Sequence, residues 1–310
     1  MLYVSTRNQK DTFTAYRALN EKTAPDGGVF IPFHLPVFTQ EELSAMTTRT
    51  CCDVIAQVLN LFFGVHLTEL DIEFELGKAP FKSETMQHKF VVAECWRNSG
   101  YSYDYILKSL YGMMATEKES GSMPAGWACV GIKIALLFGL YSVIGNTMQD
   151  VDIAITAGDY SELSAIAYAK AMGLPVEMTV CACDDDSVFW DLINRGEYSA
   201  TAINPDYIEC LLCVLLGKDI VTLAGSAVQS KWMCRIDEQQ QAILRDNIFA
   251  AVVSSKRIDS VVSNMYRTNG YTFDSEAALA YAGLQDYRSS TGISKDTLLF
   301  SKNRPVRIKE

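Results

Sequence analysis

The spacing of apolar residues divides the chain into a turn-rich opening, a helical section and a longer section of alternating strands and helices. Within residues 1–45, the stretch from Ala24 to Gly28 indicates a tight turn, and Val29 to Pro32 indicates an extended segment. Residues 50–77 repeat apolar side chains with the period of a helix, and Tyr103 to Met114 does the same. These patterns predict an N-terminal region that mixes strands and helices.

The second half of the chain alternates more regularly. Strands are expected at Phe90 to Ala93, Val151 to Ile155, Val176 to Cys181 and Thr297 to Phe300, and helices at Trp127 to Ile144, Glu162 to Met172, Asp184 to Asn194, Cys210 to Leu216, Glu238 to Ser255, Asp259 to Thr268 and Ser275 to Ser289. A strand, a helix and a second strand in succession form a βαβ unit, whose strands run parallel. The pattern therefore predicts an α/β fold with a parallel sheet flanked by helices.

One of these helices, Trp127 to Ile144, is apolar enough to raise the question of a membrane span. Lys133 lies in its middle, where a charge in a bilayer costs about 2.5–3.5 kcal/mol. A buried helix of an α/β domain has the same composition. We therefore interpret the segment as a core helix and expect no membrane association.

Charge narrows the classes of partner. The 310 residues contain 27 Lys and Arg against 37 Asp and Glu, which gives a net charge of −10. Such a chain repels nucleic acid and anionic membranes unless a basic patch overcomes the repulsion, and no run of Lys or Arg forms one. We expect no nucleic-acid partner.

The cysteines and histidines argue against disulfides and metal. The segment Met1 to Arg7 turns polar too early for a secretion signal, so the nine cysteines are expected to be reduced thiols of a cytoplasmic protein. The one CxxC pair, Cys210 and Cys213, lies in an apolar helix and is interpreted as buried thiols. His34, His66 and His88 are scattered along the chain, so no metal site is expected.

Five short segments carry a specific combination of residues. They are Tyr3 to Arg7, Ala24 to Pro32, Ile155 to Pro175, Gly270 to Asp274 and Leu299 to Ser301. Together they are similar to the threonine synthase family, enzymes of fold type II that use pyridoxal phosphate (PLP). The resemblance implies a protein of amino-acid metabolism with the large domain of that fold.

The resemblance also implies a domain organisation. Residues 1–95 correspond to the N-terminal α+β region, and 127–310 to the large α/β domain. Residues 96–126 stand where the family has a small domain, but they are too few for one βαβ crossover of roughly 30 residues. The chain thus resembles a shortened and degenerate member whose small domain is largely deleted.

The family's Schiff-base lysine has no counterpart in a gap-free alignment. The segment from Glu94 onward places Asp104 where the family has that lysine, and a carboxylate cannot form an imine. Lys108, one helical turn later, is a shifted candidate if the alignment contains an insertion. The other interpretation of Lys108 is a solvated helix lysine.

The family's cofactor contacts are altered as well. The remnant phosphate loop comprises Thr156, Ala157, Gly158, Asp159, Tyr160 and Ser161, and Ser301 is the remnant of the site under the pyridine ring. In this loop Asp159 adds a negative charge, and Ser161 restricts the backbone where the family has glycine. Phosphate binding should be weak or absent, so we expect no cofactor.

These departures favour a threonine-synthase-like protein that has lost PLP binding and threonine synthase activity. It would be a non-catalytic partner or a small-ligand-binding protein, and the face left by the missing small domain would contact a protein partner or a second copy. One alternative is a repurposed enzyme with acid–base groups drawn from Asp104, Lys108, Asp159, Asp184 to Asp186, Glu276 and Arg304. The other is a PLP-dependent lyase that uses Lys108.

Overall fold

The computed structural model describes most of the chain. The described residues are 1–87, 89–96, 102–115, 121–145, 150–158, 160–183, 187–200, 205–221, 225–228 and 231–305. His88, Asp159 and Asp184 to Asp186, which the sequence singled out, lie outside them.

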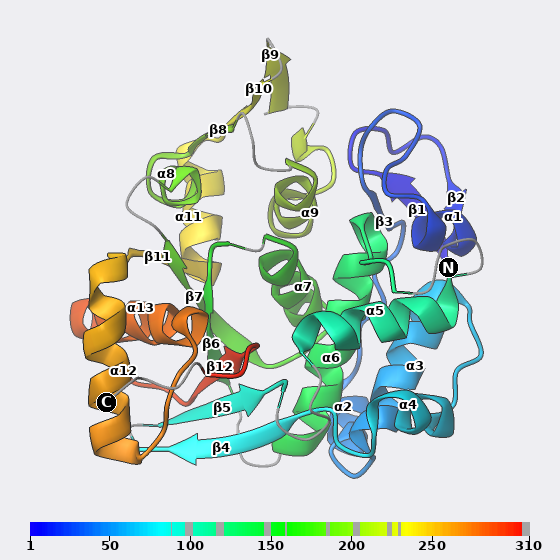
Figure 1. Ribbon diagram of the computed structural model, residues 1–310. Helices are drawn as coiled ribbons and strands as arrows, with labels where there is room; N and C mark the ends of the chain where they lie inside the picture. Colours follow the sequence, from blue (N-terminus) through cyan, green and yellow to red (C-terminus); the bar gives the residue numbers. More distant parts are fainter. Residues whose placement is uncertain are drawn as a thin grey trace.

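A six-stranded sheet forms the centre of the molecule (Figure 1). Its order is β11 (Ile248–Val252), β7 (Val176–Cys183), β6 (Val151–Thr156), β12 (Thr297–Ser301), β5 (Phe90–Glu94) and β4 (Lys82–Met86). The five strands from β11 to β5 run parallel to one another, and only the edge strand β4 is antiparallel to its neighbour. The predicted parallel sheet flanked by helices is therefore confirmed.

The register of the sheet places the carboxyl ends of five strands at one edge. Thr297 at the start of β12 pairs with Phe90 of β5 on one side and Asp152 of β6 on the other. At the far end, Ser301 lies beside Glu94. Loops that leave this edge bring side chains from distant parts of the sequence together, as expected for open parallel sheets.

Alternate residues of each strand enter two separate cores. Ile153, Ile155 and Leu298 face the larger core, whereas Ala154 and Leu299 face the smaller one. This division follows from the two-residue period of a strand. The larger core is covered by α3 (Cys51–Phe63), α6 (Gly126–Ile144), α7 (Tyr160–Ala171) and α9 (Pro205–Leu216), and the smaller by α12 (Ile258–Asn269) and α13 (Ser275–Thr291).

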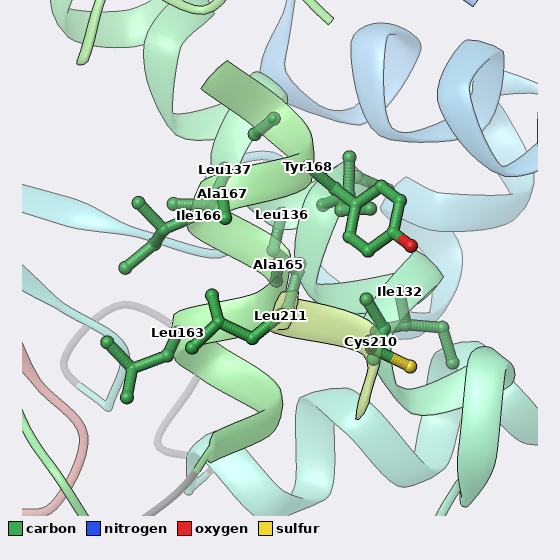
Figure 2. Close-up of a cluster of buried hydrophobic side chains, with 14 of the residues drawn as sticks. Ile132, Leu136, Leu137, Leu163, Ala165, Ile166, Ala167, Tyr168, Cys210 and Leu211 are labelled. Atoms are coloured by element: carbon green, nitrogen blue, oxygen red, sulfur yellow. The ribbon is translucent and has the colours of Figure 1, made fainter. Parts of the chain in front are cut away.

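Figure 2 shows how closely the helices of the larger core pack. Ile132 and Leu136 of α6, Leu163 and Ile166 of α7 and Leu211 of α9 belong to one hydrophobic cluster, in which Ile132 lies beside Cys210 of α9. All six side chains are almost completely buried. The long helix α6 needs no polar face, because protein surrounds it.

The candidate membrane segment is this same helix. Gly126–Ile144 is long and apolar enough to span a bilayer, and 89% of its apolar window is buried inside the protein. The interpretation as a core helix is confirmed. Lys133 is 1% exposed, so the charge at its centre must be balanced inside the fold.

The N-terminal region combines a small sheet with several helices. Its strands are β1 (Leu2–Ser5), β2 (Phe13–Thr14) and β3 (Phe30–Pro32), and its helices are α1 (Ala15–Asn20), α2 (Gln40–Met46), α3 and α4 (Glu69–Leu76). The opening motif is tied to α9, because Thr6 Oγ1 donates to the buried Glu209 at 2.6 Å and Arg7 Nη2 does so at 2.6 Å.

Two predicted helices have different bounds. Residues 50–77 form two helices rather than one, because Gly64 adopts φ 66° and ends α3. The predicted helix Glu238 to Ser255 stops at Asn247, as α11 (Glu238–Asn247), and the following apolar run is strand β11. A short apolar run fits a buried strand as well as a helix, and pairing with β7 decides between them.

The remaining elements complete the fold. They are α5 (Tyr103–Met114), α8 (Val188–Arg195), the short helix η1 (Ser255–Arg257) and the separate sheet of β8 (Glu197–Ala200), β10 (Lys231–Arg235) and β9 (Gly225–Val228). The small sheet, at the top of Figure 1, was not predicted. Helix α8 begins at Val188 and is capped by the Ser187 hydroxyl, whereas the predicted start at Asp184 lies outside the described residues.

The thiols are buried, as expected. All nine cysteines are buried, including Cys210 and Cys213 of α9. Burial raises the pKa of Cys52 to about 12 and that of Cys234 to about 11, so these side chains stay neutral at physiological pH. Among the described residues no group of His, Cys, Asp and Glu is arranged to hold a metal ion.

Asp152 is a buried carboxyl group near the start of β6, at the edge of the sheet opposite the carboxyl ends of the strands, and its effect on stability can be tested. Burial raises its pKa to about 6, against the opposing effect of Lys295. Since the folded-state pKa exceeds the unfolded value, the favourable contribution of this group exists at low pH and is lost as pH rises from about 4 to 6. Replacing Asp152 with Asn should therefore raise the free energy of unfolding at pH 7 by about 1–3 kcal/mol.

Urea unfolding at pH 4 and pH 7 measures this effect. The gain should be larger at pH 7 than at pH 4, because the wild-type carboxyl is protonated and costs less at the lower pH. Asp246→Asn, on the exposed side of α11, is the matched control and should change little. Equal stability of the wild type and Asp152→Asn at pH 7 would contradict the expectation.

Candidate functional site

A cluster of polar side chains lies at the carboxyl edge of the sheet, next to the ends of β6 and β12. It consists of Tyr103, Lys133, Ser161, Glu162 and Lys302, and is called the lysine–glutamate cluster here. Its members come from α5, α6, α7 and the residue after β12. Four segments that are far apart in the sequence thus meet through charged and polar groups.

One carboxylate oxygen lies between two ammonium groups. Lys133 Nζ is 3.4 Å from Glu162 Oε2, and Lys302 Nζ is 3.0 Å from the same oxygen. Lys133 Nζ also donates a hydrogen bond to Ser161 Oγ at 2.6 Å. The first turn of α7 therefore holds one buried and one partly buried cation through its own side chains.

Tyr103 closes the cluster from the side of α5. Its hydroxyl donates to Glu162 Oε1 at 3.1 Å. The ammonium groups of Lys302 and Lys133 lie 5.3 and 6.0 Å from the centre of its ring, within the range of cation–π attraction. One tyrosine thus stabilises the carboxylate with its hydroxyl and both lysines with its ring.

The burial of these charges makes their pairing essential. The side chains of Lys133 and Glu162 are 1% and 2% exposed, and that of Lys302 is 15% exposed. Removing one partner of a buried ion pair leaves an uncompensated charge in a medium of low polarity. From the sequence, Lys133 served only as an argument against a membrane span. A lone lysine in an apolar helix that is buried also requires a carboxylate nearby, so Lys133 could have predicted a buried ion pair from the sequence.

A second polar network fixes Ser301 beside the cluster. The Ser301 hydroxyl donates to Asp274 Oδ2 at 2.7 Å and accepts from Trp96 Nε1 at 3.1 Å. The other oxygen of Asp274 caps α13 by accepting from the Ala277 amide at 2.9 Å. The predicted ring-site residue therefore lies at this edge of the sheet, with its hydroxyl engaged by neighbouring side chains.

The two positions that the sequence suggests for the Schiff-base lysine, Asp104 and Lys108, lie outside the lysine–glutamate cluster. Helix α5 turns Tyr103 into the lysine–glutamate cluster, whereas the next residue, Asp104, is exposed. Lys108 follows Asp104 by one turn on the same face of the helix and is half-buried. The structure thus brings Lys133 and Lys302 into the cluster, and neither was predicted there.

The remnant phosphate loop joins β6 to α7. Thr156 ends β6, and the Ala157 amide donates to the Ala182 carbonyl at 2.8 Å. Tyr160 and Ser161 are already in the first turn of α7, which begins two residues earlier than predicted. Ser161 and Glu162 turn their side chains into the interior, so the start of this helix is occupied by the protein itself.

An open cleft of about 500 Å³ lies beside the same loop, at the ends of β6, β7 and β11 and the start of α13. Its lining residues are Thr156, Ala157, Gly158, Tyr160, Ala182, Cys183, Ser187, Val188, Val253, Glu276 and Leu279. We call it the edge cleft. Of the suggested acid–base residues, Glu276 lines it, whereas the side chain of Arg304 is exposed beyond β12.

Comparisons with known proteins agree with this architecture. Residues 2–78 match the sequence profile described as "Threonine synthase N terminus". A segment of 174 residues is 26% identical to "Threonine synthase-like 1" of Pongo abelii, and covers 50% of this chain and 23% of that protein. A segment of 197 residues is 20% identical to threonine synthase of Pseudomonas aeruginosa, and covers 59% of this chain and 42% of that enzyme. The matched segments therefore span less than half of these relatives.

Solved structures show the same fold. The PLP-bound threonine synthase of Brucella melitensis superposes with a TM-score of 0.81 over 98% of this chain and 89% of that one, at 16% identity. The yeast threonine synthase does so with a TM-score of 0.74 over 98% and 87%, at 13% identity. The fold is thus that of the fold type II PLP enzymes. Within this class, the chain is threonine-synthase-like: its residues 2–78 match the threonine synthase profile, and its segments and fold are similar to those of threonine synthases.

The charge balance of the lysine–glutamate cluster can be measured directly. Replacing Glu162 with Ala leaves Lys133 and Lys302 without their shared carboxylate, and should lower the free energy of unfolding by about 3–5 kcal/mol. The matched control is Glu197→Ala, which removes a carboxylate paired with Arg235 at the surface and should hardly move the unfolding midpoint. Urea denaturation of both variants that gave equal losses would contradict the assigned role of Glu162.

Proposed function

We propose that this threonine-synthase-like protein performs no PLP-dependent catalysis and acts as a binding protein, with a small ligand at the carboxyl edge of its sheet and a protein contact on its surface. One observation carries the proposal: Glu162 is buried between Lys133 and Lys302 at the start of α7. The resemblance to the family places the phosphate of the cofactor at this point.

The charge at the start of α7 does not fit PLP. A helix N-terminus attracts an anion through its free amides and its dipole. Here the Glu162 carboxylate is buried in the first turn, where it occupies the place that a phosphate would take. A phosphate group would have to displace this carboxylate from Lys133 and Lys302, both of which it already engages.

The position that aligns with the family's Schiff-base lysine does not fit covalent binding of PLP either. Asp104 stands at the aligned position, and its side chain is exposed on α5 rather than directed into the lysine–glutamate cluster. Lys108 lies on the same face as Asp104 and is half-buried. The PLP-dependent lyase that would use Lys108 therefore has weaker support than the non-catalytic protein.

A repurposed enzyme also has limited support from the geometry. Of the suggested acid–base groups, Glu276 alone lines the edge cleft among the described residues. Catalysis by acid and base needs both groups within hydrogen-bonding reach of one substrate. Asp104 and Arg304 are exposed on α5 and beyond β12, so a binding role suits the edge cleft better.

PLP binding provides the decisive test of the proposal. After incubation with PLP and desalting, the protein should show no internal-aldimine absorbance, and borohydride should fix no adduct on Lys108, Lys133 or Lys302. The threonine synthase of Pseudomonas aeruginosa is the positive control. A retained band whose adduct disappears in Lys108→Ala or Lys302→Ala would overturn the proposal and identify the lysine responsible.

The protein-contact part of the proposal rests on α4. Leu70 and Phe74, one turn apart on this helix, are 73% and 92% exposed. Helix α4 touches α5 through the hydrogen bond from the Tyr105 hydroxyl to Glu75, and α5 lies within residues 96–126, which stand where the family has its small domain. We propose this exposed apolar pair as the contact surface, since apolar side chains that lie side by side gain from being covered.

A second copy of the chain is the simplest occupant of this surface. Sedimentation velocity should show a concentration-dependent associated species that Phe74→Asp shifts to the monomer. Tyr266→Asp, a similarly exposed aromatic position on α12, is the control and should leave the association unchanged. A wild type that remains monomeric at all concentrations would remove self-association from the proposal.

A further inference from the structure

We propose that the edge cleft binds a small, mostly apolar molecule that carries an ammonium group, and that Glu276 is the counter-ion of that group. This inference rests on the small-ligand part of the proposed function and assigns it a place and a chemical class. The edge cleft borders the lysine–glutamate cluster but has a different lining: its described walls come from the β6–α7 loop, the end of β7, the start of α8, the residue after β11 and α13, and include none of the five cluster residues.

The size and lining of the edge cleft suit a small molecule. Its volume of about 500 Å³ falls within the range of ligand pockets, and it opens at the carboxyl ends of parallel strands, where open α/β sheets bind ligands. Most of the wall is apolar and is contributed by Ala157, Ala182, Val188, Val253 and Leu279. Such a wall favours a ligand with a hydrocarbon body.

The polar groups of the edge cleft define the charge of the ligand. Thr156 and Ser187 contribute hydroxyl groups that serve a cation or a neutral group equally well. Glu276 is the one charged side chain among the described lining residues, and within the described part of the chain it forms no ion pair. A carboxylate at the rim of an apolar cleft attracts an ammonium group and repels an anion.

The helix ends at the cleft do not reverse this preference. Helices α7, α8 and α13 all begin at this edge, and their positive ends would favour an anion. Each already carries a carboxylate, however: Glu162 and Asp191 lie in the first turns of α7 and α8, and Asp274 caps α13. Because the Ala157 amide is bonded to Ala182, the loop also has one fewer free donor for an anion.

Gly158 allows the edge cleft to be filled without distorting the backbone. It lines the cleft, its φ lies outside the left-handed region, and a Cβ atom built on it meets nothing within 4 Å. Gly112 in α5 has the same open surroundings and an ordinary φ, but it is not part of the cleft. The two glycines form a matched pair for substitution.

The test uses three probes of similar shape and different charge: benzylamine, benzyl alcohol and benzoate. Ligand-observed NMR titration at pH 7 and constant ionic strength gives their affinities for the full chain. Benzylamine should bind about fivefold more tightly than benzyl alcohol, as expected for one partly exposed ion pair, and benzoate should bind most weakly. Absence of binding by all three probes, or tightest binding by benzoate, would overturn the inference.

Variants place the binding site and its counter-ion. Gly158→Leu should abolish binding of every probe, whereas Gly112→Leu should bind like the wild type. Glu276→Gln should bind benzylamine and benzyl alcohol equally, without loss of benzyl alcohol affinity. If Gly158→Leu does not fold, Leu279→Trp fills the cleft from α13 and should give the same loss. Unchanged binding in a folded cleft-filling variant, or an unchanged charge preference in Glu276→Gln, would overturn the inference.

The result is independent of the test of the proposed function. A PLP adduct trapped by borohydride would overturn the non-catalytic role, whether or not benzylamine binds beside Gly158. Conversely, a protein that traps no PLP and also binds none of the probes would overturn the ligand class assigned to the edge cleft and leave the non-catalytic role standing.

Discussion

The balance of buried charge around Glu162 is the constraint on which the site depends. Two lysines that reach it come from α6 and from the end of β12, and a buried ammonium group must have a carboxylate nearby. Because α6 is otherwise apolar on every side, Lys133 fixes its rotation and its depth against α7. The same carboxylate holds the chain that leaves β12. One side chain thus positions three elements at the functional edge of the sheet.

The opposite edge of the sheet shows what buried charge costs without such pairing. Asp152 is buried near the start of β6, and burial raises its pKa although Lys295 and Arg288 oppose the shift. Glu162 has direct contacts with two ammonium groups and a tyrosine hydroxyl instead. The fold therefore tolerates a destabilising carboxylate at one edge and has a fully engaged one at the other, which is the edge where ligands bind in this class of sheet.

The sequence allowed the fold to be predicted where periodicity is strong, and less well where tertiary pairing decides. Tyr103 to Met114 and the four predicted strands of the sheet have bounds close to those observed. The sequence predicts the end of a helix where strand β11 lies, because only the pairing of this strand with β7 distinguishes the two. The site was harder still: Glu162 and Lys302 are ordinary surface residues by type, and their burial follows from the meeting of α6, α7 and β12. Only Lys133 carried a signal of its own.

A fold that is built to hold a cofactor loses part of its stability when the cofactor is absent, since a ligand bound only to the native state stabilises it. Under the proposed function, this chain must replace that contribution from within. Glu162 supplies an anion at the start of α7, where the resemblance places a phosphate, and Lys133 and Lys302 supply the cations that an internal anion requires. These three charged side chains can replace the cofactor's contribution only together, because any one of the charges buried alone would destabilise the fold. The edge cleft lies outside this set, so it remains available for a different ligand.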